Sequence, residues 1–500
     1  DAATSGDTIN VAAGTYDSSV ETFPISVNKP LTLMGAQANA DPRPSQGGRT
    51  GAESVLDADE TSKAVIRISA SDVEINGFTI TGGTGDMVEE SGAADNLLFR
   101  YNILYDDLAT SGDEAIQIKY SDGVVMEYNY VYDILQDAFN LSDSTNGVIR
   151  YNEAHGIYSD NAAIYCYKET NIDIIGNLVY DVPNNDGIKL GNADDGSSGG
   201  TVSGNEVYDV AEDSITIYAS NATVEDNTIY NCRSQNGALY LYGADNAAVT
   251  GNNIHDNDAI GLLIRKSSNV VVEENAIHSN NDADDTKYDG SAGIWLTSDT
   301  SNVTIYGNSI AGNADYGVRN DAAIVVDASG NWWGDASGPG GSGDNVSANV
   351  DYTPWLDSGT DISTDPGFQG DFSTLRVDDD SPQSGPMGRI QEGLDMVSGS
   401  TVYVAAGTYT ENIDIHKRVE IIGAGSDSDP ASNTIITQDP SGAGDTKIGV
   451  VQLTASGISG APILLQDIRL EPVSMAGISV GRFTEGTGQT VDYVKLDNVQ

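Results

Sequence analysis

One alternation of apolar and polar positions recurs along most of the chain. It reads apolar-x-apolar-x-x-Asn-x-apolar, as in "VMEYNYV" and "TVSGNEV", and it occurs eleven times at intervals of 22 to 33 residues. The asparagines of this frame are Asn76, Asn102, Asn129, Asn152, Asn177, Asn205, Asn227, Asn252, Asn275, Asn308 and Asn331. Each repeat also holds a second short apolar segment, such as "AIYCYK" or "ALYLYG". The segments show a period of two and no helical period, which predicts short strands.

A repeat of this length with two or more strands predicts an all-β parallel solenoid. Successive coils then lie about 4.8 Å apart, and equivalent residues form columns along the stack. Stacked asparagines at one turn can exchange hydrogen bonds from coil to coil, which satisfies polar groups that would be costly to bury unpaired. We therefore expect the asparagine ladder to be structural.

The repeat resembles the right-handed parallel β-helix proteins, a group that includes pectinesterases, pectate lyases, epimerases and secreted surface proteins. The opening "DTINVAAGTY" is similar to a pectinesterase first coil, and "GNWWG" followed by "YTPWL" is similar to the closing coil of secreted members. The resemblance implies the fold and its handedness. It does not imply an activity, because the catalytic segments of the pectinesterases, mannuronan epimerases, polygalacturonases and pectate lyases have no recognisable match, and this scaffold carries many functions.

The chain is expected to hold two solenoids, because "DTINVAAGTY" at 7–16 returns as "STVYVAAGTY" at 400–409. The first spans 1–355, with ladder coils at about 60–335 and a closing segment at 330–356. An acidic Gly/Ser linker follows at 356–385, and 386–500 begins the second solenoid with a capping helix at about 388–397. Both ends fall within a motif, so we expect a segment of a longer array. Within the closing segment, Trp333 is predicted to plug the last coil and Trp332 to point outward.

Charge and cysteine content exclude several classes of function. The formal net charge is -52, which argues against nucleic acid as a partner and suits a soluble surface that attracts cations. Only two cysteines are present, so no disulfide framework is expected, and no apolar run is long enough to span a membrane.

Aromatic and basic residues gather at the outward positions of the second strand. Strand alternation places inward Ile, Leu and Cys166 in the core and predicts an outward face of Tyr, Trp, Lys and Arg. Such a face suits an extended acidic polysaccharide, although strand propensity alone also favours tyrosine there. The candidate carbohydrate-binding residues are Lys119, Tyr165, Tyr167, Lys189, Tyr218, Tyr240, Tyr242, Arg265 and Trp295.

A second column, three residues after the eight asparagines from Asn102 to Asn275, consists of tyrosine and histidine rings. It includes Tyr132, His155, Tyr180, His255 and His278, and we expect stacking there and no catalysis. The next position is often aspartate and could bind calcium or another cation. A stronger calcium candidate is the loop "NDADDTKYDGSAG", whose carboxylates are Asp282, Asp284, Asp285 and Asp289. The N-glycosylation sequons are at Asn140, Asn221, Asn302 and Asn345.

These observations predict an extracellular or cell-surface structural or adhesive protein. It would form oligomers or polymers with copies of itself, bind carbohydrate and possess no certain cofactor, with Ca²⁺ as the candidate ion. No catalytic residue can be assigned. The alternative is a polysaccharide lyase or epimerase that uses the Tyr/Lys/Arg face on an acidic polysaccharide.

Overall fold

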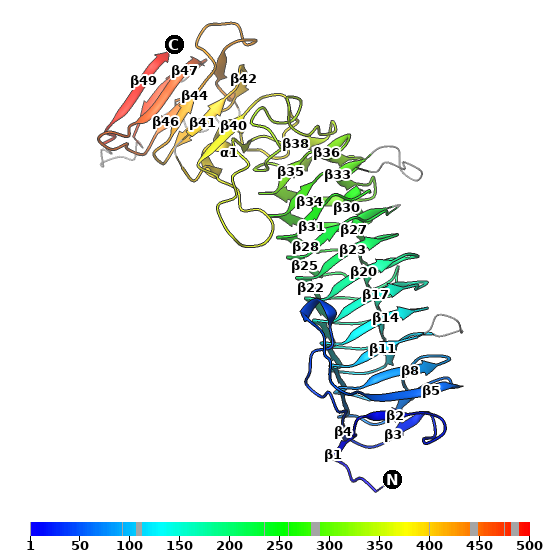
Figure 1. The fold of residues 1–500 in the computed structure, drawn as a ribbon. Coiled ribbons are helices and arrows are strands. Elements are labelled where there is room, and N and C mark those ends of the chain that lie inside the picture. Colours follow the sequence, from blue (N-terminus) through cyan, green and yellow to red (C-terminus); the bar gives the residue numbers. More distant parts are fainter. Residues whose placement is uncertain are drawn as a thin grey trace. The chain divides into compact units, whose positions relative to one another are not determined.

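The computed structural model describes residues 2–92, 94–106, 113–234, 236–258, 260–281, 291–399, 401–440, 449–474, 476–481 and 490–500. Two compact units are present (Figure 1). The first contains residues 1–302 and 313–315, and the second contains 303–312 and 316–500. The division therefore falls inside the run of ladder coils and not at the linker expected at 356–385.

Three parallel sheets run along the first unit, and each coil contributes one strand to each sheet. Sheet A contains, in spatial order, β1 (Asp7–Asn10), β4 (Leu31–Met34), β7 (Glu74–Asn76), β10 (Leu98–Arg100), β13 (Val125–Glu127), β16 (Val148–Arg150), β19 (Asp173–Ile175), β22 (Thr201–Ser203), β25 (Thr223–Glu225), β28 (Ala248–Thr250) and β31 (Ser268–Glu273). Sheet B contains β2 (Gly14–Tyr16), β5 (Ser54–Ser62), β8 (Thr79–Gly83), β11 (Ile103–Tyr105), β14 (Tyr130–Ile134), β17 (Glu153–Ile157), β20 (Leu178–Val182), β23 (Glu206–Val210), β26 (Thr228–Tyr230), β29 (Asn253–His255) and β32 (Ala276–His278).

Sheet C completes each coil and is the sheet that carries the predicted binding face. It contains β3 (Ile25–Val27), β6 (Ile66–Ile68), β9 (Val88–Glu90), β12 (Ile116–Lys119), β15 (Phe139–Ser142), β18 (Ala162–Tyr167), β21 (Asp186–Leu190), β24 (Ile215–Ile217), β27 (Gly237–Tyr242), β30 (Ile260–Arg265) and β33 (Ala292–Leu296). A single 3₁₀ turn, Pro44–Gln46, precedes β5. Inward residues of all three sheets, such as Ile149, Val179 and Ile188, are fully buried, so the core runs along the whole stack. The prediction of a parallel β-solenoid is confirmed.

The asparagine ladder forms from Asn102 to Asn275 and between Asn308 and Asn331, but the prediction was wrong for Asn76. Strand register pairs Asn76 with Arg100, so Phe78 takes the ladder position and its backbone N–H donates to Oδ1 of Asn102 at 3.1 Å. Asn152 is typical: its backbone N–H and its Nδ2 donate to Oδ1 of Asn177 at 2.9 and 3.0 Å, and Nδ2 also donates to the carbonyl of Met126 at 2.9 Å. In the second unit, Nδ2 of Asn308 donates to Oδ1 of Asn331 at 2.9 Å. A buried ladder amide such as that of Asn152 thus bonds both the backbone of the preceding coil and the asparagine of the next coil.

Two further amide ladders were not predicted. A buried one joins Asn257, Asn280 and Asn313 through amide contacts of 2.9 and 3.0 Å. An exposed one contains Asn221, Asn246, Asn269 and Asn302, with amide contacts of 3.1, 3.0 and 2.7 Å. Each residue of the exposed ladder stands six residues before an asparagine of the first ladder (Asn227, Asn252, Asn275 and Asn308), so the repeat frame contained a signal that sequence reasoning missed.

The predicted column of rings on sheet B is confirmed. Its tyrosine and histidine rings stack in parallel from Tyr105 to His278, and the centroids of neighbouring rings are 4.8 to 5.8 Å apart. The aspartates that follow have a local backbone reason: Asp133, Asp181, Asp209 and Asp256 have φ values of 54°, 52°, 53° and 53°. Aspartate tolerates this left-handed conformation better than most residues, so the acidic column follows from the turn geometry.

The second unit contains the remaining strands and one helix. They are β34 (Ser301–Tyr306), β35 (Ser309–Ala311), β36 (Tyr316–Asn320), β37 (Val326–Asp327), β38 (Val350–Asp351), β39 (Trp355–Leu356), β40 (Thr374–Val377), α1 (Arg389–Met396), β41 (Thr401–Val404), β42 (Gly407–Thr410), β43 (Ile413–Ile415), β44 (Glu420–Ile422), β45 (Thr434–Thr437), β46 (Val451–Leu453), β47 (Ile463–Glu471), β48 (Ile478–Val480) and β49 (Val494–Val499). One sheet has the order β39-β40-β41-β44-β47-β45-β42, and a smaller one the order β43-β46-β48.

Two features of the second unit concern the predicted closing segment and linker. Trp333 is fully buried, as the plug interpretation requires, whereas Trp332 lies against the backbone of Gly359. The expected unpatterned linker at 356–385 contains β40, whose residues "TLRV" alternate between partly exposed and buried positions. This strand pairs with β39 on one side and β41 on the other, so the segment is part of the sheet.

Candidate functional site

The outward side chains of sheet C form two columns. Strand register places Asn140, Tyr165, Lys189, Thr216, Tyr240, Leu263 and Trp295 in the first column. The second column includes Lys119, Ser142 and Tyr167, which are paired on the neighbouring strands β12, β15 and β18. Further along the stack it includes Tyr242 and Arg265, which are paired on β27 and β30. Tyr218 directly follows β24, two residues after Thr216 of the first column. The predicted carbohydrate-binding residues are therefore brought to one sheet face.

The first column is largely covered, which the sequence did not reveal. Tyr165, Tyr240 and Trp295 retain only 7%, 5% and 3% of their exposed area. With so little exposed area, these rings cannot serve as open platforms. The six other predicted residues are partly exposed. The accessible part of the face is thus narrower than predicted and follows the second column.

Cations lie over tyrosine rings along this second column. Nζ of Lys168 is 4.8 Å from the ring centroid of Tyr167, and Nζ of Lys266 is 4.6 Å from that of Tyr242. Arg265 also approaches Tyr242, at 5.5 Å. Such pairs are stabilised by the attraction between a cation and the ring quadrupole. We call the set Lys119, Tyr167, Lys168, Tyr218, Tyr242, Arg265 and Lys266 the Tyr/Lys stripe.

Lys189 connects the stripe with buried acids. Its Nζ lies 5.6 and 5.7 Å from the ring centroids of Tyr165 and Tyr218, and 3.9 Å from Oδ2 of Asp186. Burial raises the pKa of both phenols to about 12, so neither Tyr165 nor Tyr218 is poised to act as a base near neutral pH.

A column of carboxylates lies behind the first column, and sequence reasoning missed it. Each acid stands three residues before an outward side chain and contacts it: Glu114 accepts from Gln117 at 2.8 Å, and Asp137 accepts from Asn140 at 2.8 Å. The hydroxyl of Thr216 lies 3.1 Å from Oδ2 of Asp186 and 3.5 Å from Oδ2 of Asp213. The available signal was an acid two residues before the first inward residue of the strand, in "DEAIQI", "QDAFNL", "NDGIKL" and "EDSITI".

Burial raises the pKa of Asp137, Asp186 and Asp213. The pKa of Asp186 is raised to about 8, first by desolvation and then by the charge of Asp213. Desolvation also raises the pKa of Asp137 and of Asp213 to about 6. Because the side chains are almost wholly buried, they serve as a hydrogen-bonded support for Lys189 and its neighbours.

The other predicted site residues have varied surroundings. The calcium candidates Asp282, Asp284, Asp285 and Asp289 lie outside the described residues. Within the described part of the chain, no group of three or more His, Cys, Asp or Glu residues has an arrangement that could hold a metal ion. Both cysteines are free and buried, as the core assignment of Cys166 predicts.

The glycosylation candidates divide into two classes. Asn221, Asn302 and Asn345 are exposed. Asn140 is buried, and its Nδ2 donates to Asp137, so the folded protein offers no free amide for a glycan at this position. A sequon shows only the local sequence, and burial decides whether it is reachable.

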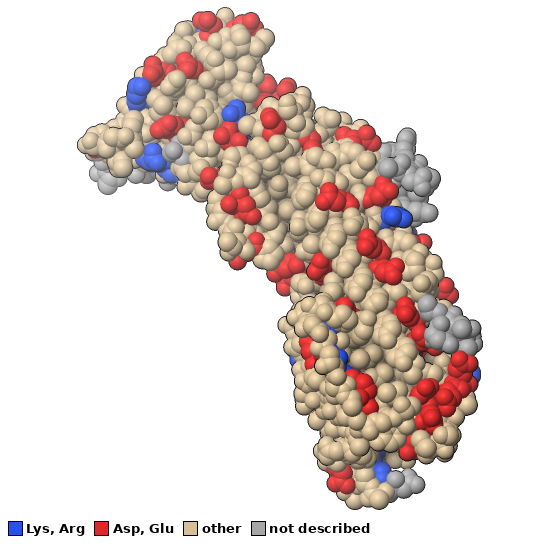
Figure 2. All heavy atoms as spheres, viewed as in Figure 1, with Lys and Arg blue, Asp and Glu red and all other residues tan. Residues whose placement is uncertain are grey.

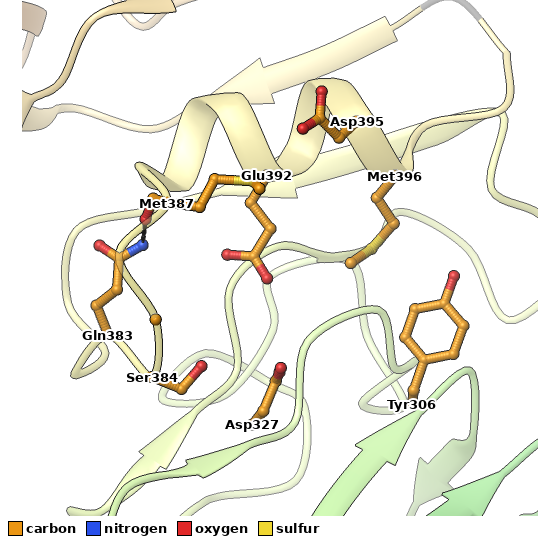
Figure 3. A pocket seen from close by; sticks show the side chains of 9 residues that line it. Tyr306, Asp327, Gln383, Ser384, Met387, Glu392, Asp395 and Met396 are labelled. Atoms are coloured by element: carbon orange, nitrogen blue, oxygen red, sulfur yellow. Dashed lines mark hydrogen bonds between the residues drawn. The ribbon is translucent and has the colours of Figure 1, made fainter. Parts of the chain in front are cut away.

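A cavity of about 360 Å³ lies beside α1 in the second unit (Figure 3). Glu392 extends from the helix toward Asp327, and Met387, Met396 and Tyr306 supply apolar walls. Burial, together with the charges of Asp351 and Asp327, raises the pKa of Glu392 to about 7. Arg389 next to it donates to Ser381 and so fixes the loop that closes this side.

Acidic residues dominate the surface away from the stripe. Figure 2 shows Asp and Glu side chains scattered over the visible face, with few Lys and Arg between them.

No helix among the described residues is long and apolar enough to cross a membrane.

No curated protein sequence matches the chain. Among solved structures, a mannuronan C-5 epimerase A-module from Azotobacter vinelandii is 16% identical with a TM-score of 0.41, covering 69% of this chain and 91% of its own. A PL6 family alginate lyase is 11% identical with a TM-score of 0.40, covering 100% and 74%. The catalytic unit of an alpha-1,3-glucanase from Streptomyces thermodiastaticus is 16% identical with a TM-score of 0.36, covering 72% and 65%.

At these identities and scores we draw no functional conclusion from the solved structures. The family comparison is stronger, because the model described as "Right handed beta helix region" matches residues 57–195 and 162–332. Together these matches extend over more than half of the 500 residues. The chain therefore belongs to the right-handed β-helix family.

Proposed function

We propose that this chain binds an acidic polysaccharide outside the cell, along the Tyr/Lys stripe of sheet C. The observation that carries the proposal is the pairing of cations with partly exposed tyrosines on the second column, at Tyr167 and at Tyr242. Neighbouring coils are about 4.8 Å apart, and the strands that carry Tyr167 and Tyr242, β18 and β27, are three coils apart, so a linear anionic polymer about 14 Å long can contact both pairs. Lys and Arg supply charge-assisted hydrogen bonds to carboxylates, and the ring edges supply apolar contact.

The overall charge of the protein does not prevent such binding. At physiological salt the screening length is about 8 Å, so carboxylates beyond that distance contribute little at the stripe. Asp143, which interacts with Lys168, and Asp299, which interacts with Arg265, offset part of the local positive charge. The local cations Lys168, Arg265 and Lys266 then determine the interaction. This contrast with the acidic surroundings also keeps an anionic chain on the stripe and away from the rest of the surface.

The affinity for polygalacturonate and alginate oligosaccharides provides the test. Tyr242→Ala removes the ring that Arg265 and Lys266 approach, and we expect about a tenfold loss of affinity, the equivalent of about 1.4 kcal/mol. Isothermal titration calorimetry measures this change at 0.15 M salt. Lys495→Gln, which changes an exposed lysine of the second unit, is the matched control and should bind as the parent does. Equal affinity of Tyr242→Ala and parent would refute the assignment.

The alternative, a lyase or epimerase, requires a base near neutral pH. The raised pKa of Tyr165 and Tyr218 disfavours both phenols in that role, which is why we favour binding over catalysis. Incubation with alginate, pectate and glycosaminoglycans distinguishes the two. Growth of ultraviolet absorbance from an unsaturated product would establish a lyase, and a proton-exchange signal at the uronate C-5 would establish an epimerase.

We also propose a structural or adhesive role in which copies assemble in the presence of calcium. Its support is the excess of carboxylates, 75 Asp and Glu against 23 Lys and Arg, which divalent cations can bridge. Analytical ultracentrifugation with calcium or with chelator tests it. We expect larger species with calcium, and identical sedimentation in both conditions would exclude calcium-dependent assembly.

A further inference from the structure

A second pocket lies in the second unit, on the sheet that contains β39, β40, β41 and β44. Outward residues of these strands stand side by side in register, with Trp355 opposite Arg376, Arg376 beside Tyr403, and Tyr403 beside Ile422. They form the floor of a cavity of about 390 Å³. This volume is within the range of about 300 to 1,000 Å³ that is usual for small-molecule sites.

The closing segment builds one wall of this pocket. The indole N–H of Trp355 donates to the carbonyl of Ala336 at 3.2 Å, and the loop passes so close that a Cβ on Gly338 would lie 2.7 Å from the ring. Gly338 has a φ of 68°, so glycine is required there for both space and conformation. The ring of Tyr352 meets Trp355 edge-on at 5.9 Å. The wall is thus fixed by packing before any ligand arrives.

Polar groups surround the aromatic floor. The guanidinium of Arg376 lies 5.1 Å from the ring centroid of Tyr403, and its Nε donates to Asp357 at 2.5 Å. Asp378 stands at the rim and accepts from the hydroxyl of Tyr352 at 3.1 Å, and Asp380 beside it is exposed. Carboxylates accept hydrogen bonds from hydroxyl groups and a guanidinium donates to them, so the rim offers both kinds of partner to a diol.

Tyr403 is the least expected residue of the pocket. It is 37% exposed, although it lies in the middle of a sheet. Alignment of the two "VAAGTY" copies places Asn10 at the same position of the first solenoid, where β1 forms without a ring. The strand therefore does not need tyrosine at this position, and its ring is available for a ligand.

We propose that the pocket formed by Trp355, Arg376, Asp378, Asp380, Tyr403 and Ile422 binds a neutral pyranose oligosaccharide. The exposed tyrosine edge packs against the apolar face of a sugar ring, while Arg376 and the aspartates bind its hydroxyls. The charge of Arg376 is neutralised by its ion pair with Asp357. The carboxylates of Asp378 and Asp380 therefore leave the pocket with an excess of negative charge, which opposes the binding of a uronate. The class of ligand rests on the proposed function, whereas the residues and the preferred charge are distinct from those of the Tyr/Lys stripe.

The experiment titrates the full chain with neutral trisaccharides (malto-, cello-, laminari- and xylotriose) and with trigalacturonate, by calorimetry. We expect at least one neutral trisaccharide to bind at one site, and Tyr403→Asn to lower its affinity at least tenfold. Tyr403→Asn restores the residue of the first copy, so it is expected to fold, and circular dichroism checks this. Tyr403→Phe keeps the ring and should retain affinity within about threefold.

The two sites fail independently. If trigalacturonate does not bind but a neutral sugar binds and requires Tyr403, the stripe proposal fails and the pocket proposal holds. Tyr242→Ala, which changes the stripe, should leave neutral binding unchanged. The pocket proposal is overturned if no neutral trisaccharide binds, or if neutral binding is the same in Tyr403→Asn and parent.

Discussion

Asn177→Ala will lower the free energy of unfolding of the first unit by about 3 to 5 kcal/mol. Oδ1 of Asn177 accepts from the backbone N–H and Nδ2 of Asn152, and its Nδ2 donates to the carbonyl of Ile149 and to Oδ1 of Asn205. All of these groups are buried, so alanine leaves two donors and two acceptors short of a partner.

Guanidinium denaturation followed by circular dichroism measures this loss. Asn184→Ala is the matched control, because Asn184 is exposed and its amide makes only one long hydrogen bond, 3.5 Å to Tyr158. We expect the control to unfold within about 0.5 kcal/mol of the parent. If both variants shift equally, the ladder does not stabilise the fold through its hydrogen bonds.

The ladder could be predicted because the sequence repeats it in a constant frame. From Asn102 onward the coils present an asparagine at the same corner, so a single interpretation accounts for ten of the eleven predicted positions, and only Asn76 lies out of register. The stacked rings from Tyr105 to His278 follow from the same register. Columns of equivalent residues are the part of a solenoid that a sequence reveals directly, since one coil repeats the geometry of the last.

Exposure could not be predicted in the same way. Strand alternation correctly predicted that the side chains of Tyr165, Tyr240 and Trp295 point away from the core, yet all three side chains are buried. Whether an outward ring meets solvent depends on the turns beside it, and these vary in length and composition from coil to coil. The same limit applies to Asn140, whose sequon is intact although its amide is enclosed and bonded to Asp137.

The buried carboxylates and the Tyr403 pocket depend on contacts between segments distant in sequence. Nothing near Asp186 indicates that Thr216 and Asp213, one coil further, surround it. The pocket forms only where the closing segment at Ala336 contacts Trp355 of β39. It also needs β40, which pairs with β39 but lies in the segment that we predicted to be a linker from its composition. A strand of four residues in Gly- and Asp-rich surroundings gives too short an alternation to be recognised.

The stability of the first unit should fall as pH rises, because of Asp186. Its pKa is about 8 in the folded protein against an ordinary value of 3.8, since burial and the neighbouring charge of Asp213 oppose ionisation. Between these two values the folded state retains a proton that the unfolded chain has lost. Stability is therefore fully present below pH 3.8 and is lost as pH rises through about 8.

Asp186→Asn should remove this dependence, because the amide keeps the shape of the carboxyl group and carries no charge. Asp213 and Glu212 oppose the charge on Asp186, whereas Lys189, 3.9 Å away, and the hydroxyl of Thr216, 3.1 Å away, favour the charged form. We expect the variant to exceed the parent at pH 8 by on the order of 2 kcal/mol in free energy of unfolding, and to match it near pH 4.

Denaturation curves at pH 4, 6 and 8 test this expectation, with Asp181→Asn as the matched control. Asp181 lies in the left-handed region, where asparagine is equally tolerated, and its side chain is exposed, so the same chemical change should leave stability nearly constant at each pH. If Asp186→Asn were less stable than the parent at pH 8, the carboxylate would be ionised and held by Lys189. The buried column would then act as an ion-paired support for Lys189, and not as the proton-retaining network that its burial implies.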